Sequence, residues 1–176
     1  VMAEEEVTGT EQAQAPQQQF VLQRVYLKDL SFESPATPGV FKSEWKPQMN
    51  VDLNTKSDKI DEEGNFEVVL TVTITAKVED QTAFLIEVQQ AGIFFIKGFE
   101  GEDLRRLLGT AAPNILFPYA REAIDNILTK GSFPPLMIPP INFDALFASA
   151  VQQAAAKAKV QLHRPTRSID LRHAPS

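Results

Sequence analysis

Cysteine is absent from the 176-residue sequence, and histidine occurs only twice. Without cysteine, the chain forms no disulfide, offers no thiolate nucleophile and builds no zinc–cysteine site. Both histidines, His163 and His173, lie close to the C-terminal end. The rest of the sequence therefore lacks the commonest general base and the commonest metal ligand. We expect no catalytic residues, no metal site, no cofactor and no enzymatic activity.

Long hydrophobic runs and nucleotide-binding or hydrolase motifs are missing as well. The longest apolar stretches, AGIFFI and PPLMIPPI, fall far short of the roughly 18 residues of a membrane span. No GxGxxG, GxxxxGK[ST], GxSxG or HExxH pattern occurs. Residues 1–19 are acidic and glutamine-rich without a basic region, which is not the pattern of a secretory signal. The sequence predicts a cytoplasmic protein that does not insert into a membrane.

Charge is unevenly distributed along the chain. The formal net charge is −6, while the hydrophobic content of 43% and the charged content of 23% are ordinary for a globular protein. Residues 1–19 contain four glutamates and no base, whereas residues 157–176 contain five Lys or Arg and one Asp. We predict a folded domain over 20–159, between a disordered acidic tail (1–19) and a disordered basic tail (160–176). An acidic body also argues against a nucleic-acid partner.

Alternation of apolar and polar residues predicts β-strands in the first half of the chain. In FEVVLTVTITAKV (66–78), every second residue is apolar and the intervening face is rich in threonine. Short polar turns between such segments favour antiparallel hairpins. Four strands are predicted, over 20–34, 49–55, 66–78 and 83–96.

Helical spacing predicts helices in the second half. A short amphipathic helical turn over 102–109 is expected to end at Gly109, and a helix over 113–131 at Gly131. Pro118 either opens or kinks the longer helix. Asn142 is a natural N-cap for a helix over 143–159. Strands followed by helices indicate an α+β fold, with a four-stranded antiparallel sheet and two C-terminal helices packed on one face.

Acidic residues recur on two of the predicted strands. Asp29 and Glu33 share one face of the first strand, and Leu85 and Glu87 share a face of the fourth. An ordinary solvated sheet face explains this pattern, and so does an acidic docking patch for a basic partner. A catalytic carboxylate pair does not fit, because about 13 Å separates positions four apart on a strand, against roughly 5–9.5 Å in glycosidases.

Residues 131–147, GSFPPLMIPPINFDALF, combine four prolines with many large apolar side chains. Proline excludes this stretch from a helix interior or a central strand. Two loop aromatics, Phe41 and Trp45, lie between the first two predicted strands. These apolar residues either pack as satellite core beneath long loops or form a groove for an extended polypeptide.

Five segments, in this order and spacing, resemble the SecB family of bacterial export chaperones: LQRVYLKDLSFESP, FKSEWKP, EVQQAGIF, PNILFPYARE and INFDALF. The resemblance covers roughly residues 20–153. It implies a SecB-like fold, a homotetramer built as a dimer of dimers, and ATP-independent binding of unfolded preproteins. It also implies delivery of these preproteins to the SecA motor ATPase of the Sec translocon.

The resemblance assigns roles to individual residues of this sequence. It implies that SecA docks at Asp29, Glu33, Leu85 and Glu87. It also implies that Val88 and Gln90 are needed for an intact tetramer. The long helix of the family lies at the subunit interface, which adds Tyr119 and Ile124. The implied client-binding residues are Phe41, Trp45, Met49, Val51, Leu53, Phe133, Leu136, Ile138 and Phe147.

The C-terminal segment departs from the family pattern. SecB tails usually end acidic or polar just after the last helix, whereas this chain continues with the basic stretch KVQLHRPTRSIDLRHAPS. The role of this stretch stays open. The alternative function is an adaptor that docks one folded partner through its acidic sheet and does not hold unfolded clients.

Overall fold

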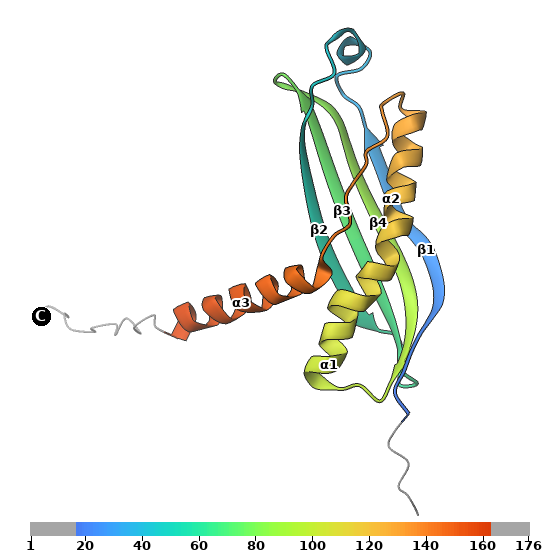
Figure 1. Cartoon of the computed structure of the whole chain (residues 1–176), viewed down its shortest axis with the longest axis vertical. Helices are drawn as coiled ribbons and strands as arrows, with labels where there is room; N and C mark the ends of the chain where they lie inside the picture. Colours follow the sequence, from blue (N-terminus) through green and yellow to red (C-terminus); the bar gives the residue numbers. More distant parts are fainter. Residues whose placement is uncertain (1–16, 163–176) are drawn as a thin grey trace, which may run out of the picture.

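The computed structural model describes residues 17–162. Four strands form one antiparallel sheet in the order β1-β4-β3-β2 (Figure 1). The strands are β1 (Gln19–Glu33), β2 (Gln48–Lys59), β3 (Asn65–Val78) and β4 (Gln81–Lys97). Residues 34–47, which include a short 3₁₀ helix η1 (Gly39–Lys42), connect the two edge strands β1 and β2. The four predicted strands and their antiparallel pairing are confirmed.

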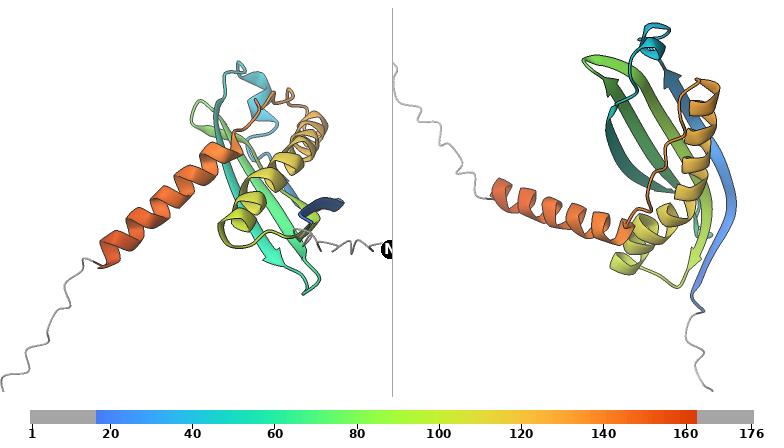
Figure 2. Two further views of the ribbon diagram at one scale, coloured as in Figure 1. Left: turned by 60° about the horizontal axis from the view of Figure 1, so that its bottom comes forward. Right: turned by 45° about the horizontal axis from the view of Figure 1, so that its top comes forward.

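The sheet has an inner face, toward the helices, and an outer face that the described helices leave uncovered (Figures 1 and 2). Pairing of Val72 with Val88 and of Thr73 with Glu87 assigns alternate residues of β3 and β4 to the two faces. The apolar side of β3 is inner and its threonines are outer, as the alternation predicts. The buried inner residues of β3 are Val68, Leu70, Val72, Ile74, Ala76 and Val78.

Two irregularities interrupt the pairing of β1 with β4. Between Leu22 and Arg24, and again between Leu27 and Asp29, β1 advances two residues while β4 advances one. Such a bulge moves the following residues to the opposite face of the sheet. The second bulge, at Lys28, therefore places Asp29 on the outer face although Leu27 is on the inner face.

The main helix is longer than predicted. Helix α1 (Gly101–Arg106) runs through a π-helical turn η2 (Leu107–Ala111) directly into α2 (Ala112–Lys130). The predicted end at Gly109 is wrong, because Gly109 is not among the residues with positive φ that would reverse the chain there. Pro118 lies inside α2, whose first turn holds Pro113 instead. The predicted end at Gly131 is confirmed, since Gly131 N donates to Ile127 O at 2.9 Å.

Helix α2 lies along the inner face over β4 and β3 (Figure 1). Its residues Leu116, Ala120, Ile124 and Leu128 recur every four positions and are fully buried. Close approach is possible because β4 has Gly92 beneath the helix, where an added Cβ would meet Leu116 Cδ2 at 2.9 Å. This helix–sheet interface forms the hydrophobic core of the folded domain.

Helix α3 (Phe143–Leu162) projects away from the sheet and from α2 (Figures 1 and 2). Its start is held firmly, since Phe143 is buried against Phe117 with ring centroids 5.9 Å apart. The predicted N-cap is confirmed by the hydrogen bond from Ala145 N to Asn142 Oδ1 at 3.0 Å. The α+β fold class is confirmed, with α2 covering the sheet and α3 contacting η2 before it runs outward (Figure 1). The alanine-rich remainder offers little apolar surface for packing.

Of the predicted tails, residues 1–16 and 163–176 lie outside the described residues. No helix within 17–162 is long and apolar enough to cross a membrane.

Candidate functional site

An aromatic cluster surrounds Phe133 at one end of the inner face. The ring centroid of Phe133 lies 5.1 Å from that of Phe84, 5.4 Å from Phe41 and 5.5 Å from Trp45. Phe133 is only 5% exposed, whereas Phe41 is 51% exposed. The cluster thus has a buried base and an exposed rim, and it brings together three of the predicted client-binding residues.

The inner side of β2 is an exposed apolar strip. Met49, Val51 and Leu53 pair with inner-face residues of β3 and therefore point to the side where α2 lies. Helix α2 packs over β4 and β3, so it does not cover this edge of the sheet. Met49 and Val51 each remain 39% exposed. This strip extends from the aromatic cluster toward α3.

A pocket of about 520 Å³ lies between β2, η2 and α3; we call it the lower pocket. Two predicted client-binding residues, Leu53 and Phe147, contribute to its lining. Leu108, Phe143 and Leu146 also line it and were not among the predicted site residues. Leu146 was detectable from the sequence, since it shares helical spacing with Phe147, Ala150 and Val151. The other two roles depend on how the helices meet.

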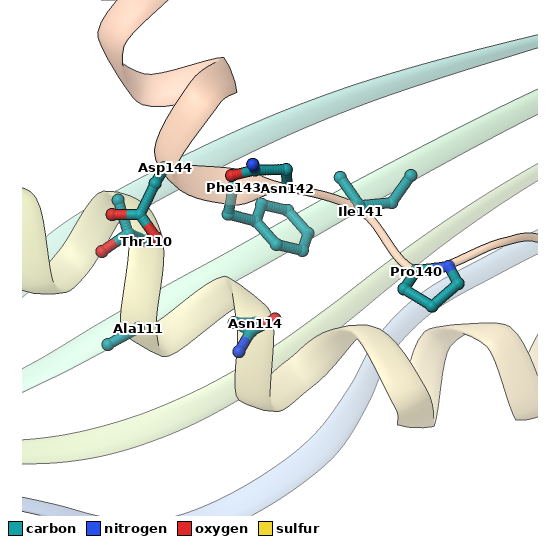
Figure 3. Close-up of a pocket in the computed structure, with 8 residues that line it drawn as sticks. All are labelled: Thr110, Ala111, Asn114, Pro140, Ile141, Asn142, Phe143 and Asp144. Atoms are coloured by element: carbon teal, nitrogen blue, oxygen red, sulfur yellow. The ribbon is translucent and has the colours of Figure 1, made fainter.

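A second pocket, of about 550 Å³, lies on the other side of Phe143, between the start of α2 and residues 140–144 (Figure 3). Its lining is more polar, with Asn114, Asn142 and Asp144 around the side chains of Ile141 and Phe143 (Figure 3). Phe143 lines both pockets, so the junction of the 131–142 segment with α3 separates them.

The proline-rich segment 131–142 runs along α2 and is bonded to it. Leu136 N donates to Asp125 Oδ1 at 2.9 Å, and Arg121 donates to Ile138 O at 3.4 Å. Ile138 is buried, Leu136 is partly buried, and Met137 is 88% exposed. Phe133 and Ile138 therefore join the core, as the satellite-core interpretation predicts, whereas Met137 faces solvent. Met137 was not among the predicted site residues.

The four predicted SecA-docking residues lie together on the outer face. Glu33 pairs with Leu85 across β1 and β4, Asp29 pairs with Gln89, and Glu87 pairs with Ser31. We call Asp29, Glu33, Leu85 and Glu87 the acidic patch. Within the described residues, no ion pair involves its three carboxylates. The patch therefore presents uncompensated negative charge on the face opposite the exposed apolar strip.

Next to the acidic patch, three residues link β1 to β3 over the outer face. Lys28 Nζ lies 2.8 Å from Glu67 Oε2, and the Tyr26 hydroxyl donates to Glu67 Oε1. Hydrogen bonds from Lys28 and then from Tyr26 lower the pKa of Glu67. Burial, followed by the bond to Glu67, raises the pKa of Tyr26 to about 12.

Most of the predicted oligomer-interface residues lie in the interior of the folded chain. Val88 and Ile124 are fully buried, and Gln90 is 4% exposed, with Nε2 donating to Tyr26 O at 2.9 Å. Tyr119 is 49% exposed on α2. Only Tyr119 is therefore placed to contact a second copy directly. Among the described residues, no group of three His, Cys, Asp or Glu could hold a metal ion.

The fold is shared with a solved SecB-like chaperone of Mycobacterium tuberculosis, determined in complex with a peptide from an antitoxin. That structure superposes with a TM-score of 0.57 at 17% sequence identity, covering 69% of this chain and 87% of the other. The similarity establishes the architecture, a SecB-like arrangement of sheet and helices.

Sequence comparison identifies the family. The family model described as preprotein translocase subunit SecB matches residues 12–154. The protein-export protein SecB of Hahella chejuensis is 60% identical, covering 84% of this chain and 93% of the relative. Its counterpart from Pseudomonas aeruginosa is 51% identical, covering 96% and 99%. The chain therefore belongs to the SecB family of protein-export chaperones, and the adaptor alternative finds no support in these similarities.

Proposed function

We propose that the protein holds unfolded preproteins on its inner face without using ATP and hands them to SecA through its outer face. The observation that carries this proposal is the exposed apolar strip of β2, which α2 leaves uncovered between the aromatic cluster and the lower pocket. Soluble proteins seldom leave such a continuous apolar surface exposed unless it binds a partner. An extended chain is the occupant that fits a long, narrow strip.

Client binding in this scheme relies on burial of apolar side chains, at roughly 25 cal/mol per Å² before the costs of association are subtracted. Such burial is non-directional, so many unrelated hydrophobic segments bind. A preprotein that folds quickly buries those segments and escapes, while one that folds slowly is held. The predicted client-binding residues that are exposed, Phe41, Met49 and Val51, make the first contacts.

The proposed SecA contact uses the acidic patch. Clustered carboxylates accelerate and orient the docking of a basic surface. The acidic patch and the apolar strip lie on opposite faces of one sheet. The separation supports simultaneous binding of client and SecA, which a handover requires.

The proposal also includes a homotetramer, a dimer of dimers, that acts in the cytoplasm. An edge strand such as β1, which is 15 residues long and pairs with β4 along one side, supports association with another strand. Tyr119 supplies exposed aromatic surface on α2. Val88, Gln90 and Ile124 then act indirectly, by holding α2 in position. Several grooves on one tetramer add avidity along a long client.

The test is the refolding of a slow-folding preprotein diluted from denaturant, with and without a stoichiometric amount of the protein and with no nucleotide. We expect folding to stop at a soluble complex, detected by light scattering, and to resume when a competing unfolded chain is added. An unchanged refolding rate would show that the apolar strip does not hold clients, and the adaptor function would then be the better explanation.

A further inference from the structure

Gly109 lies in the middle of a continuous helix, in the π-helical turn η2. Glycine is a poor helix former, and this residue is not among those with positive φ. The backbone conformation therefore does not explain its presence. A π-helical turn inside a long helix is often associated with a functional site.

The contact that explains Gly109 is with Phe147 of α3. A Cβ added to Gly109 would lie 2.5 Å from Phe147 Cδ2 and 2.9 Å from Phe147 Cε2. Real Cβ atoms do not approach other atoms so closely, so any side chain here would displace the ring. The Phe147 ring thus rests directly on the main chain of η2.

This contact sets how α3 is placed beside β2, from where it runs outward (Figure 1). Two further attachments lie at the first residues of α3, the buried Phe143 and a 3.3 Å ion pair between Asp144 and Arg106. Phe147 is one turn further along, where α3 forms one wall of the lower pocket. The opposite wall is β2, with Leu53 and Thr55. The distance between the two walls therefore depends on how closely Phe147 approaches η2.

We propose that Gly109 is a positioning residue for client binding. Without a side chain at Gly109, Phe147 packs directly on η2 and holds α3 beside β2. The lower pocket between α3 and β2 then has a width that suits a large apolar side chain of an extended client. This inference rests on the proposed function, since it assigns the lower pocket to the client-binding surface.

The first measurement concerns the position of α3. Because the chain contains no cysteine, a Ser57→Cys/Gln153→Cys pair introduces the only two thiols, one on each wall of the lower pocket. We expect Gly109→Ala to slow the cross-linking of this pair by a bismaleimide at least about threefold. Gly39→Ala is the matched control, since its Cβ meets nothing within 4 Å. Equal rates in the two variants would overturn the proposal.

The second measurement concerns binding of a fluorescein-labelled, unstructured peptide with leucine at alternate positions. We expect Gly109→Ala to weaken its binding about tenfold, while Gly39→Ala stays within about twofold of the parent protein. In a Phe147→Ala background, Gly109→Ala should have no further effect, because the ring it displaces is gone. The helix propensity gained with alanine offsets part of the lost Phe147 contact, so the thermal midpoint should change little with Gly109→Ala. A large fall would overturn the positioning role in favour of general destabilisation.

The outcomes separate the inference from the proposed function. If the parent protein and the Gly109→Ala variant bind the peptide equally well, the positioning role is refuted and the holding function stays intact. Parent protein that fails to bind the peptide refutes the holding function and, with it, the assignment of the lower pocket to clients. Additive effects of Gly109→Ala and Phe147→Ala would also refute the positioning role.

Discussion

The hydroxyl of Tyr26 on β1 donates a hydrogen bond to the carboxylate of Glu67 on β3, across the intervening strand β4. Ala91 is the β4 residue that pairs with Tyr26, and its small side chain leaves room for the phenol ring to cross. Lys28, the residue at the second bulge, binds the same carboxylate. The three side chains bond the edge strand β1 to β3, and β1 contributes Asp29 and Glu33 to the acidic patch.

The first prediction is that Tyr26 ionises at a higher pH than an ordinary tyrosine. In a Tyr119→Phe variant, Tyr26 is the only tyrosine, and its titration is followed by tyrosinate absorbance. We expect a midpoint near the raised pKa of about 12. Because this pKa exceeds the unfolded value of 10.0, the contribution of Tyr26 to stability is complete below pH 10 and is lost as the pH rises toward 12. Glu67→Gln should lower the midpoint, and a midpoint at the unfolded value would contradict the structure.

A second prediction separates the core and the rim of the aromatic cluster. Phe133→Ala removes the buried ring at the centre of the cluster and should destabilise the protein by about 3–5 kcal/mol. Phe41→Ala trims an exposed ring and should change stability by less than about 1 kcal/mol while weakening client binding. Denaturant unfolding, followed by the fluorescence of the single tryptophan Trp45, measures the first effect at constant protein concentration. Equal destabilisation by both variants would show that Phe41 also belongs to the core.

The third prediction is that the two faces of the sheet act independently. Glu33→Lys places a base in the acidic patch and should weaken SecA binding at least about tenfold, measured by titration calorimetry. Holding of an unfolded preprotein should be unchanged, because the apolar strip is on the opposite face. Asp52→Lys, the same charge change on the outer face of the far edge strand β2, is the control. Parallel loss of client and SecA binding would refute separate surfaces.

The fourth prediction concerns the contact between α2 and the sheet. Gly92→Ala adds a methyl group 2.9 Å from Leu116 Cδ2 and 3.2 Å from the Arg24 carbonyl oxygen. Since the backbone on one side cannot yield easily, we expect a loss of about 1–3 kcal/mol in the free energy of unfolding. In the proposed tetramer, α2 lies at the subunit interface, so light scattering should also report a lower mass for this variant. A variant as stable as the parent would mean that α2 is packed more loosely than the structure indicates.

Local patterns in the sequence were sufficient for most elements of the fold. Alternation in β3 and β4 predicts which residues face the helices, because a strand repeats every two residues. The two bulges of β1 were not predictable in this way, since a bulge depends on how two strands pair. The alternation of Asp29, Ser31 and Glu33 predicts that the three share a face, but only the bulge at Lys28 explains why that face is opposite to the face of Leu27.

Glycine and proline were less reliable guides than alternation. Gly131 ends α2 as expected, whereas Gly109 lies within a helix because of a contact with Phe147, nearly forty positions away. Leu108 and Phe143 are also far apart in the sequence, so their shared role in the lower pocket was not predictable from local patterns. Such roles depend on packing between elements, which periodicity along one element does not contain.

The central position of β4 limits how the protein can change. Core residues such as Val88 and acidic-patch residues such as Glu87 are immediate neighbours on this strand and face opposite ways. Inserting or deleting one residue in β4 would exchange the two sets beyond that point, burying carboxylates and exposing the core at once. Substitutions at every second position can alter the outer surface one residue at a time. The partner specificity of that surface is therefore open to gradual change, while the length of β4 is fixed.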